Sequence, residues 1–76
     1  MVTYEGQSPS EIRTGDKVTD SLGRIFYALS DAYMELGDWE VKGETPTGDV
    51  KWFTLDPKSL VTISYDESAW NQDEWN

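Results

Sequence analysis

The sequence predicts an all-β protein, a small barrel of about five short strands. Several short segments alternate apolar and polar residues, and turn residues recur at intervals of roughly six to ten positions. No segment carries a convincing long helical pattern. With 76 residues the chain holds one domain. A domain of this size buries only about 60% of the surface that its unfolded chain exposes, so aromatic side chains must supply much of the core.

The first half of the chain predicts two strands after a loosely structured start. Val2 and Tyr4 begin at most an edge strand, and residues 8–11 (SPSE) predict one helical turn with Ser8 as its N-cap. Residues 17–20 (KVTD) form a short strand candidate. Residues 24–30 (RIFYALS) are apolar on both faces, which predicts a central strand with Tyr27 in the core.

The second half predicts a hairpin and a final strand. Residues 31–38 (DAYMELGD) are ambiguous: they form either the far arm of a hairpin with the preceding strand or a short turn of helix. Residues 39–44 and 50–55 alternate cleanly around the turn signal TPTGD, and Phe53 is expected in the core. Residues 56–60 (DPKSL) predict a 3₁₀ turn before the last strand, residues 61–65.

Residues 37–63, GDWEVKGETPTGDVKWFTLDPKSLVTI, resemble the second half of an SH3-type barrel. The matching features are Gly-Asp-Trp at 37–39, Thr47-Gly48 in the distal turn, and the Pro-x-x-hydrophobic turn at 57–60. The resemblance implies a five-stranded SH3-like barrel. It carries over little of the aromatic ladder with which SH3 domains bind polyproline peptides, since Trp39 and Pro57 match but Leu60 replaces an aromatic residue. The short, acidic, Trp-rich style is similar to small accessory proteins of bacteriophages.

The residue types argue against an enzyme. The chain has no Cys and no His, which removes the thiol nucleophile and the commonest general base and metal ligand. The Asp residues occur at predicted turns, where their side chains usually bind the local backbone (Asp16, Asp20, Asp31, Asp38, Asp49 and Asp56). We therefore predict no catalytic residue, no cofactor and no metal site.

The charge of the chain predicts a basic partner. Fifteen acids and six bases give a net charge of −9, of which −4 belongs to residues 66–76 and −5 to residues 1–65. We divide the chain into a barrel domain, 1–65, and an acidic Trp-containing tail, 66–76. Negative charge repels nucleic acids and anionic membranes, so direct binding to either is not expected.

The four Trp residues fall into two groups. Trp39 and Trp52 flank the distal turn, so they could be cross-strand neighbours that cover the barrel, or one ring could stay exposed as a binding anchor. Trp70 and Trp75 lie among acids, and they could either seal the end of the barrel or form a recognition tail. The candidate partner-binding residues are Trp39, Trp52, Asp66, Glu67, Trp70, Asp73, Glu74 and Trp75.

These patterns predict an interaction protein. The leading hypothesis is a viral-type protein that binds and inhibits or modulates a host protein, in its sharpest form as a nucleic-acid mimic like anti-restriction and some anti-CRISPR proteins. The alternative is a peptide-binding or assembly module that uses the Trp39 groove or a strand edge. The chain shows no signal-peptide pattern, so we expect a cytoplasmic protein, in the host cytoplasm if it is viral.

Overall fold

The computed structural model describes residues 2–65. In it, seven strands form a curled sheet, and one 3₁₀ helix follows the first strand. The elements are β1 (Val2–Gln7), η1 (Pro9–Glu11), β2 (Lys17–Thr19), β3 (Ile25–Ala28), β4 (Tyr33–Glu35), β5 (Asp38–Glu44), β6 (Val50–Leu55) and β7 (Val61–Tyr65). The all-β class is confirmed, but the prediction of five strands is wrong. The acidic tail predicted at 66–76 lies outside the described residues.

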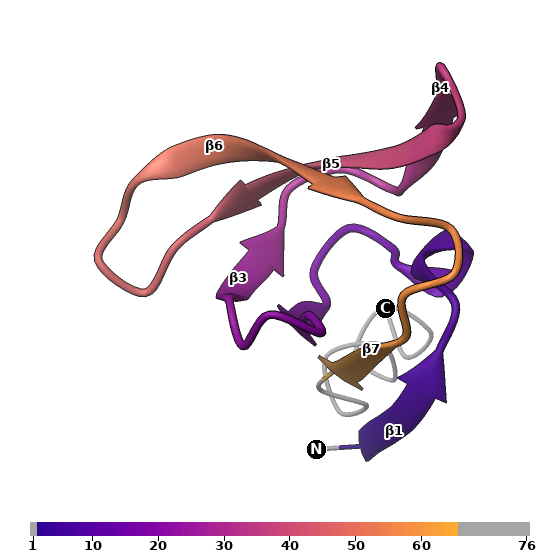
Figure 1. Ribbon diagram of the computed structural model, residues 1–76. Helices are drawn as coiled ribbons and strands as arrows, with labels where there is room; N and C mark the ends of the chain where they lie inside the picture. The colour runs from indigo at the N-terminus through magenta and orange to yellow at the C-terminus, as the bar shows by residue number, and fades with distance from the viewer. Residues whose placement is uncertain (1, 66–76) are drawn as a thin grey trace, which may run out of the picture.

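The sheet is antiparallel and runs in the order β1-β7-β2-β3-β5-β4, with β6 paired to the other edge of β5. Figure 1 shows the β5–β6 hairpin arching over one side of the molecule, while β1 and β7 lie on the opposite side. The sheet thus curls into a half-barrel around a single core.

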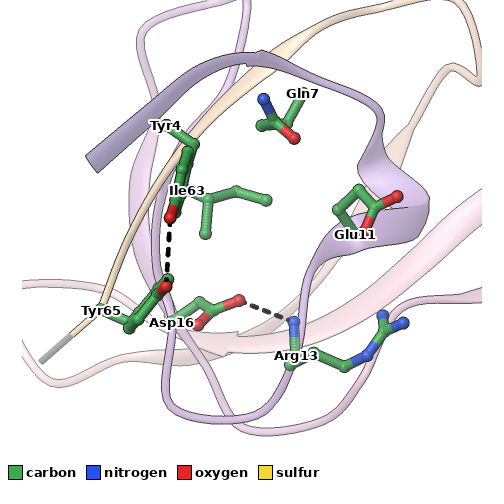
Figure 2. A pocket seen from close by; sticks show the side chains of 7 residues that line it. All are labelled: Tyr4, Gln7, Glu11, Arg13, Asp16, Ile63 and Tyr65. Atoms are coloured by element: carbon green, nitrogen blue, oxygen red, sulfur yellow. Dashed lines mark hydrogen bonds between the residues drawn. The ribbon is translucent and has the colours of Figure 1, made fainter. Parts of the chain in front are cut away.

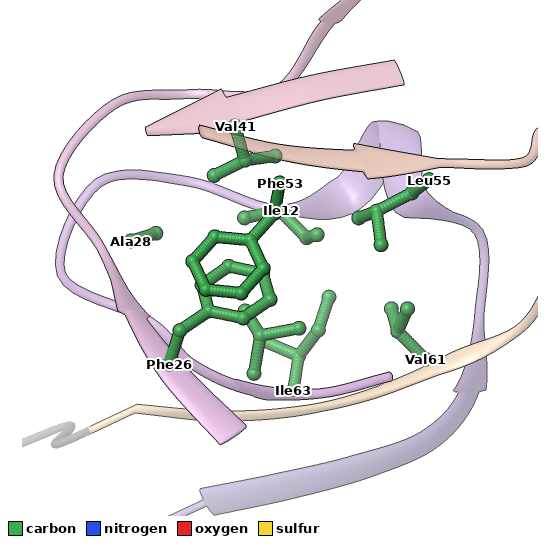
Figure 3. Packing of buried hydrophobic residues seen from close by; sticks show 9 residues of the cluster. Ile12, Phe26, Ala28, Val41, Phe53, Leu55, Val61 and Ile63 are labelled. Atoms are coloured by element: carbon green, nitrogen blue, oxygen red, sulfur yellow. The ribbon is translucent and has the colours of Figure 1, made fainter. Parts of the chain in front are cut away.

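The core lies in the hollow of this half-barrel (Figure 3). Phe26 and Phe53 stack at its centre with their ring centroids 4.0 Å apart and their planes 11° from parallel. Phe53 is therefore buried as predicted. Around this pair lie the other buried apolar side chains: Ile12, Val18, Ala28, Val41, Leu55, Val61 and Ile63.

Two turns differ from the sequence expectations. Residues 31–38 contain the strand β4, which pairs with β5 rather than with β3, so neither predicted alternative is correct. Residues 56–60 form a hydrogen-bonded turn in which Ser59 N donates to Asp56 O at 2.9 Å, not a 3₁₀ helix. The helical turn predicted at residues 8–11 is confirmed as η1, capped by Ser8, whose Oγ accepts from Ser10 N at 3.2 Å.

Three of the six turn carboxylates, those of Asp16, Asp20 and Asp56, bind the local backbone as the sequence predicts, whereas Asp31 binds Thr14, 17 residues away. Asp20 Oδ1 accepts from Leu22 N and Arg24 N, and its Oδ2 lies 2.5 Å from Arg24 Nε. Asp31 Oδ1 accepts from Thr14 N and Thr14 Oγ1. Asp16 and Asp56 accept backbone N–H groups in the same way. The hydrogen bonds of these carboxylates therefore stabilise the loops.

Candidate functional site

The two Trp residues of the β5–β6 hairpin point to opposite faces of the sheet. Trp39 pairs with Leu55 and packs partly buried against the core, whereas Trp52 pairs with Lys42 and is 57% exposed. The expectation that the two rings are cross-strand neighbours is wrong. The ring that remains accessible as an anchor is Trp52.

Trp52 belongs to an aromatic group on the convex side of the sheet. Val41 and Gly43 point into the core, so the alternate residues of β5 point outward. Tyr33 of β4 lies opposite Glu40 and reaches across β5 to Trp52, with 6.1 Å between the ring centroids and an edge-to-face angle of 84°. Edge-to-face contact of this kind stabilises two rings that both stay in contact with solvent.

Tyr27 and Val50 extend the same surface along the other half of β5. Both lie in register with Glu44, on the two sides of it. Tyr27 is 44% exposed, so the expectation that it lies in the core is wrong. Phe26, its neighbour in β3, fills that core position instead.

Four carboxylates lie among these apolar side chains. Asp38, Glu40 and Glu44 occupy alternate positions of β5, and Glu35 of β4 lies opposite Asp38. Lys42 is the base within this row, so four acids and one base give the face a charge of −3. We call this surface the outer face, and it consists of Tyr27, Tyr33, Glu35, Asp38, Glu40, Lys42, Glu44, Val50 and Trp52.

Two details describe the surroundings of the carboxylates on the outer face. Partial desolvation, followed by the charges of Glu35 and Glu40 and a hydrogen bond with Glu35, raises the pKa of the Tyr33 hydroxyl. The Oε2 atom of Glu40 is shielded from solvent and accepts no hydrogen bond from residues 2–65. A shielded carboxylate oxygen of this kind normally has a donor.

A concave site, separate from the outer face, lies between β1, η1 and β7 (Figure 2). Its cavity measures about 260 Å³. The carboxylate of Asp16 faces into it, and Asp16 Oδ2 accepts from Arg13 N at 2.8 Å. Burial is the main cause that raises the pKa of the Asp16 carboxyl, and it outweighs the Arg13 backbone hydrogen bond and the Arg13 charge, which lower it.

The structure places only part of the residue set expected from the sequence, and the partner-binding role of every member stays a prediction. Trp39 and Trp52 are placed as above. Asp66, Glu67, Trp70, Asp73, Glu74 and Trp75 lie outside the described residues, so their role stays a prediction. The sequence reasoning missed Tyr33 and the carboxylates of β4 and β5; the alternation of Asp38, Glu40, Lys42 and Glu44 opposite Val41 was the signal that could have found them.

Other features of residues 2–65 add little chemistry. No group of three or more potential ligands in this part of the chain is arranged to hold a metal ion. None of its helices is long and apolar enough to cross a membrane. The chain matches no protein family model, and no curated protein or solved structure matches it either.

Proposed function

We propose that this protein is a non-enzymatic interaction module that binds a basic protein surface through its outer face. The observation that carries the proposal is the exposed Trp52, held by Tyr33 and placed among four carboxylates. Trp and Tyr are the residues that most often dominate the affinity of protein interfaces. Carboxylates around them attract a positively charged partner and orient it before the rings are buried.

The unpaired carboxylate oxygen of Glu40 supports the proposal of a cationic partner. Its Oε2 atom is covered by neighbouring side chains and lacks a donor, and an Arg or Lys side chain that displaced this cover would supply the missing charge-assisted hydrogen bond. A nucleic acid would meet a face of charge −3 instead, and its phosphates would be repelled. Charge thus favours a protein with basic residues over a nucleic acid.

A host enzyme that handles nucleic acid is the partner class that we favour, because its substrate groove is basic. Alternate residues of a strand lie roughly 6.8 Å apart, so Asp38 and Glu40 present two carboxylates in line. Lys42 interrupts the row before Glu44. Mimicry of nucleic acid would therefore rest on the Glu35, Asp38 and Glu40 end of the face, with the aromatic rings adding contacts that phosphates lack.

The SH3-like peptide-binding alternative draws less support from the geometry. The curled sheet is compatible with a barrel-like fold, but the Trp39 ring packs against the core. Neither of the two cavities described for residues 2–65 is lined by Trp39.

Photo-crosslinking tests the proposal. A benzophenone amino acid replaces Trp52 in one variant and Leu22, an exposed residue of the β2–β3 turn, in a control variant. In lysate of the source cells at low salt, we expect a discrete crosslinked protein from position 52, absent from position 22 and weakened by added salt. Equal labelling from both positions, or no product from position 52, would refute the outer face as the binding surface.

A further inference from the structure

The cavity between β1, η1 and β7 has a local structural origin. The pairing of β1 with β7 shifts register between Tyr4 and Gln7, and Gly6 adopts a positive φ of 64° there. Such a bulge bends the strand away from its neighbour. The space that opens is lined by Tyr4, Gln7, Glu11, Arg13, Asp16, Ile63 and Tyr65.

The walls of this cavity are aromatic and apolar. Tyr4 and Tyr65 stack with 5.9 Å between their centroids and an interplanar angle of 27°. Their hydroxyls lie 3.5 Å apart, and Figure 2 shows both on one side of the cavity, with Ile63 beside them. A space of about 260 Å³ is comparable to roughly nine waters at about 30 Å³ each, which suits one long side chain better than a larger ligand.

Besides the tyrosines, the polar residues that line the cavity are two acids, Glu11 and Asp16, one base, Arg13, and one amide, Gln7. Asp16 is 4% exposed and Glu11 lies at the exposed rim. The guanidinium of Arg13 donates to Ser10 O at 2.8 Å and to Ile12 O at 3.1 Å. In Figure 2 it points away from the cavity, so Arg13 offers Asp16 its backbone N–H rather than a direct ion pair.

We propose that this cavity binds the guanidinium or ammonium end of a basic side chain from a protein partner. The stacked tyrosines would pack along the aliphatic stem and attract the cation, while Asp16 and Glu11 would accept its hydrogen bonds. A buried carboxylate that lacks an ion pair gains most from such a ligand, because the cation restores the charge compensation lost with water. A neutral or anionic side chain would leave Asp16 uncompensated.

The test is an NMR titration of the full chain, labelled with ¹⁵N, with N-acetyl-arginine methylamide. The neutral control is the corresponding citrulline amide, and the corresponding lysine amide extends the test to ammonium. We expect saturable shifts for residues around Tyr4, Asp16 and Ile63 with the arginine compound and none with citrulline. Equal shifts with citrulline, or no saturable shift with either cation, would overturn the proposal.

Amino-acid substitutions test whether arginine binds at this cavity. Asp16→Asn keeps an acceptor for Arg13 N but removes the charge, and we expect it to weaken arginine binding about tenfold. Glu11→Gln, at the exposed rim, should give a smaller loss and serves if Asp16→Asn fails to fold. Asp38→Asn and Trp52→Ala alter the outer face and should leave this titration unchanged, so failure here and failure of the proposed function are separable. Unchanged arginine binding in a folded Asp16→Asn variant would overturn the proposal.

Discussion

Replacement of Gly43 by Ala tests the packing that holds the outer face in place. Gly43 lies in β5 and points into the core, between outward-facing Lys42 and Glu44. A Cβ atom at this position would lie 2.5 Å from Phe26 Cδ2 and 3.0 Å from Phe53 Cε2. Both ring atoms belong to the stacked pair at the centre of the core, so neither ring can move without displacing the other.

The size of the effect follows from this contact. Forcing an extra methyl group into a packed core costs about 1–3 kcal/mol. Disturbing the stacked pair adds about 0.5–1.5 kcal/mol. A net loss of about 2–3 kcal/mol is large beside the roughly 4–11 kcal/mol typical of a domain of this length. In a domain this small it corresponds to a fall in Tm of roughly 10–20 °C.

Urea unfolding followed by tryptophan fluorescence and circular dichroism measures the loss. Lys42→Ala is the matched control, because it places Ala at the next position of β5 on the solvent side and should change the free energy of unfolding by less than about 0.5 kcal/mol. Phe26→Leu should reduce the extra penalty of Gly43→Ala, because a smaller side chain leaves room for the methyl group. A Gly43→Ala protein as stable as the wild type would refute the described packing.

Three further predictions concern turns. Asp20→Ala should lower the free energy of unfolding by about 2–3 kcal/mol in urea unfolding, because the buried carboxylate accepts hydrogen bonds from Leu22 N and Arg24 N. Asp20→Asn should lower the free energy of unfolding by less, because its amide oxygen still accepts these bonds and only the ion pair with Arg24 is lost. Leu36→Asn should raise Tm by a few degrees, because Leu36 has a φ of 50° in the two-residue β4–β5 turn and Asn tolerates that conformation; an unchanged or lower Tm would contradict this. Asp31→Asn should destabilise the protein near neutral pH and not in strong acid. The hydrogen bonds from Thr14 lower the pKa of Asp31, so its stabilisation is present above the ordinary value of about 3.9 and is lost as pH falls through the lowered value; a pH-independent difference in Tm would contradict this.

The sequence predicts the all-β class and the β5–β6 hairpin because alternation and turn chemistry are local signals. It does not show which face of β3 is buried, since both faces are apolar and periodicity cannot choose between them. Only the tertiary packing places Phe26 inside and Tyr27 outside. The pairing of β4 with β5 was missed because Leu at position 36 hides a hairpin turn that Asn or Gly at that position would have signalled.

The placement of the two hairpin Trp residues depends on register. The turn places Glu44 opposite Val50. Counted from that pair, Trp39 is five positions back and Trp52 two positions forward, so the two side chains point to opposite faces. A sequence pattern without the register of the turn does not show which Trp faces the core. The residues that share the outer face could therefore not be identified from the sequence alone.

The affinity of the partner identified by crosslinking, measured for wild type, Trp52→Ala and Leu22→Ala by calorimetry, tests the central claim most directly. Trp52 is exposed and outside the core, so its replacement removes mainly the contact with Tyr33 and should lower Tm by only a few degrees. It should weaken binding at least about thirtyfold, as expected for a central interface Trp. Leu22→Ala should bind like the wild type. A Trp52→Ala protein that binds this partner with wild-type affinity would contradict the claim that the outer face is the interaction surface.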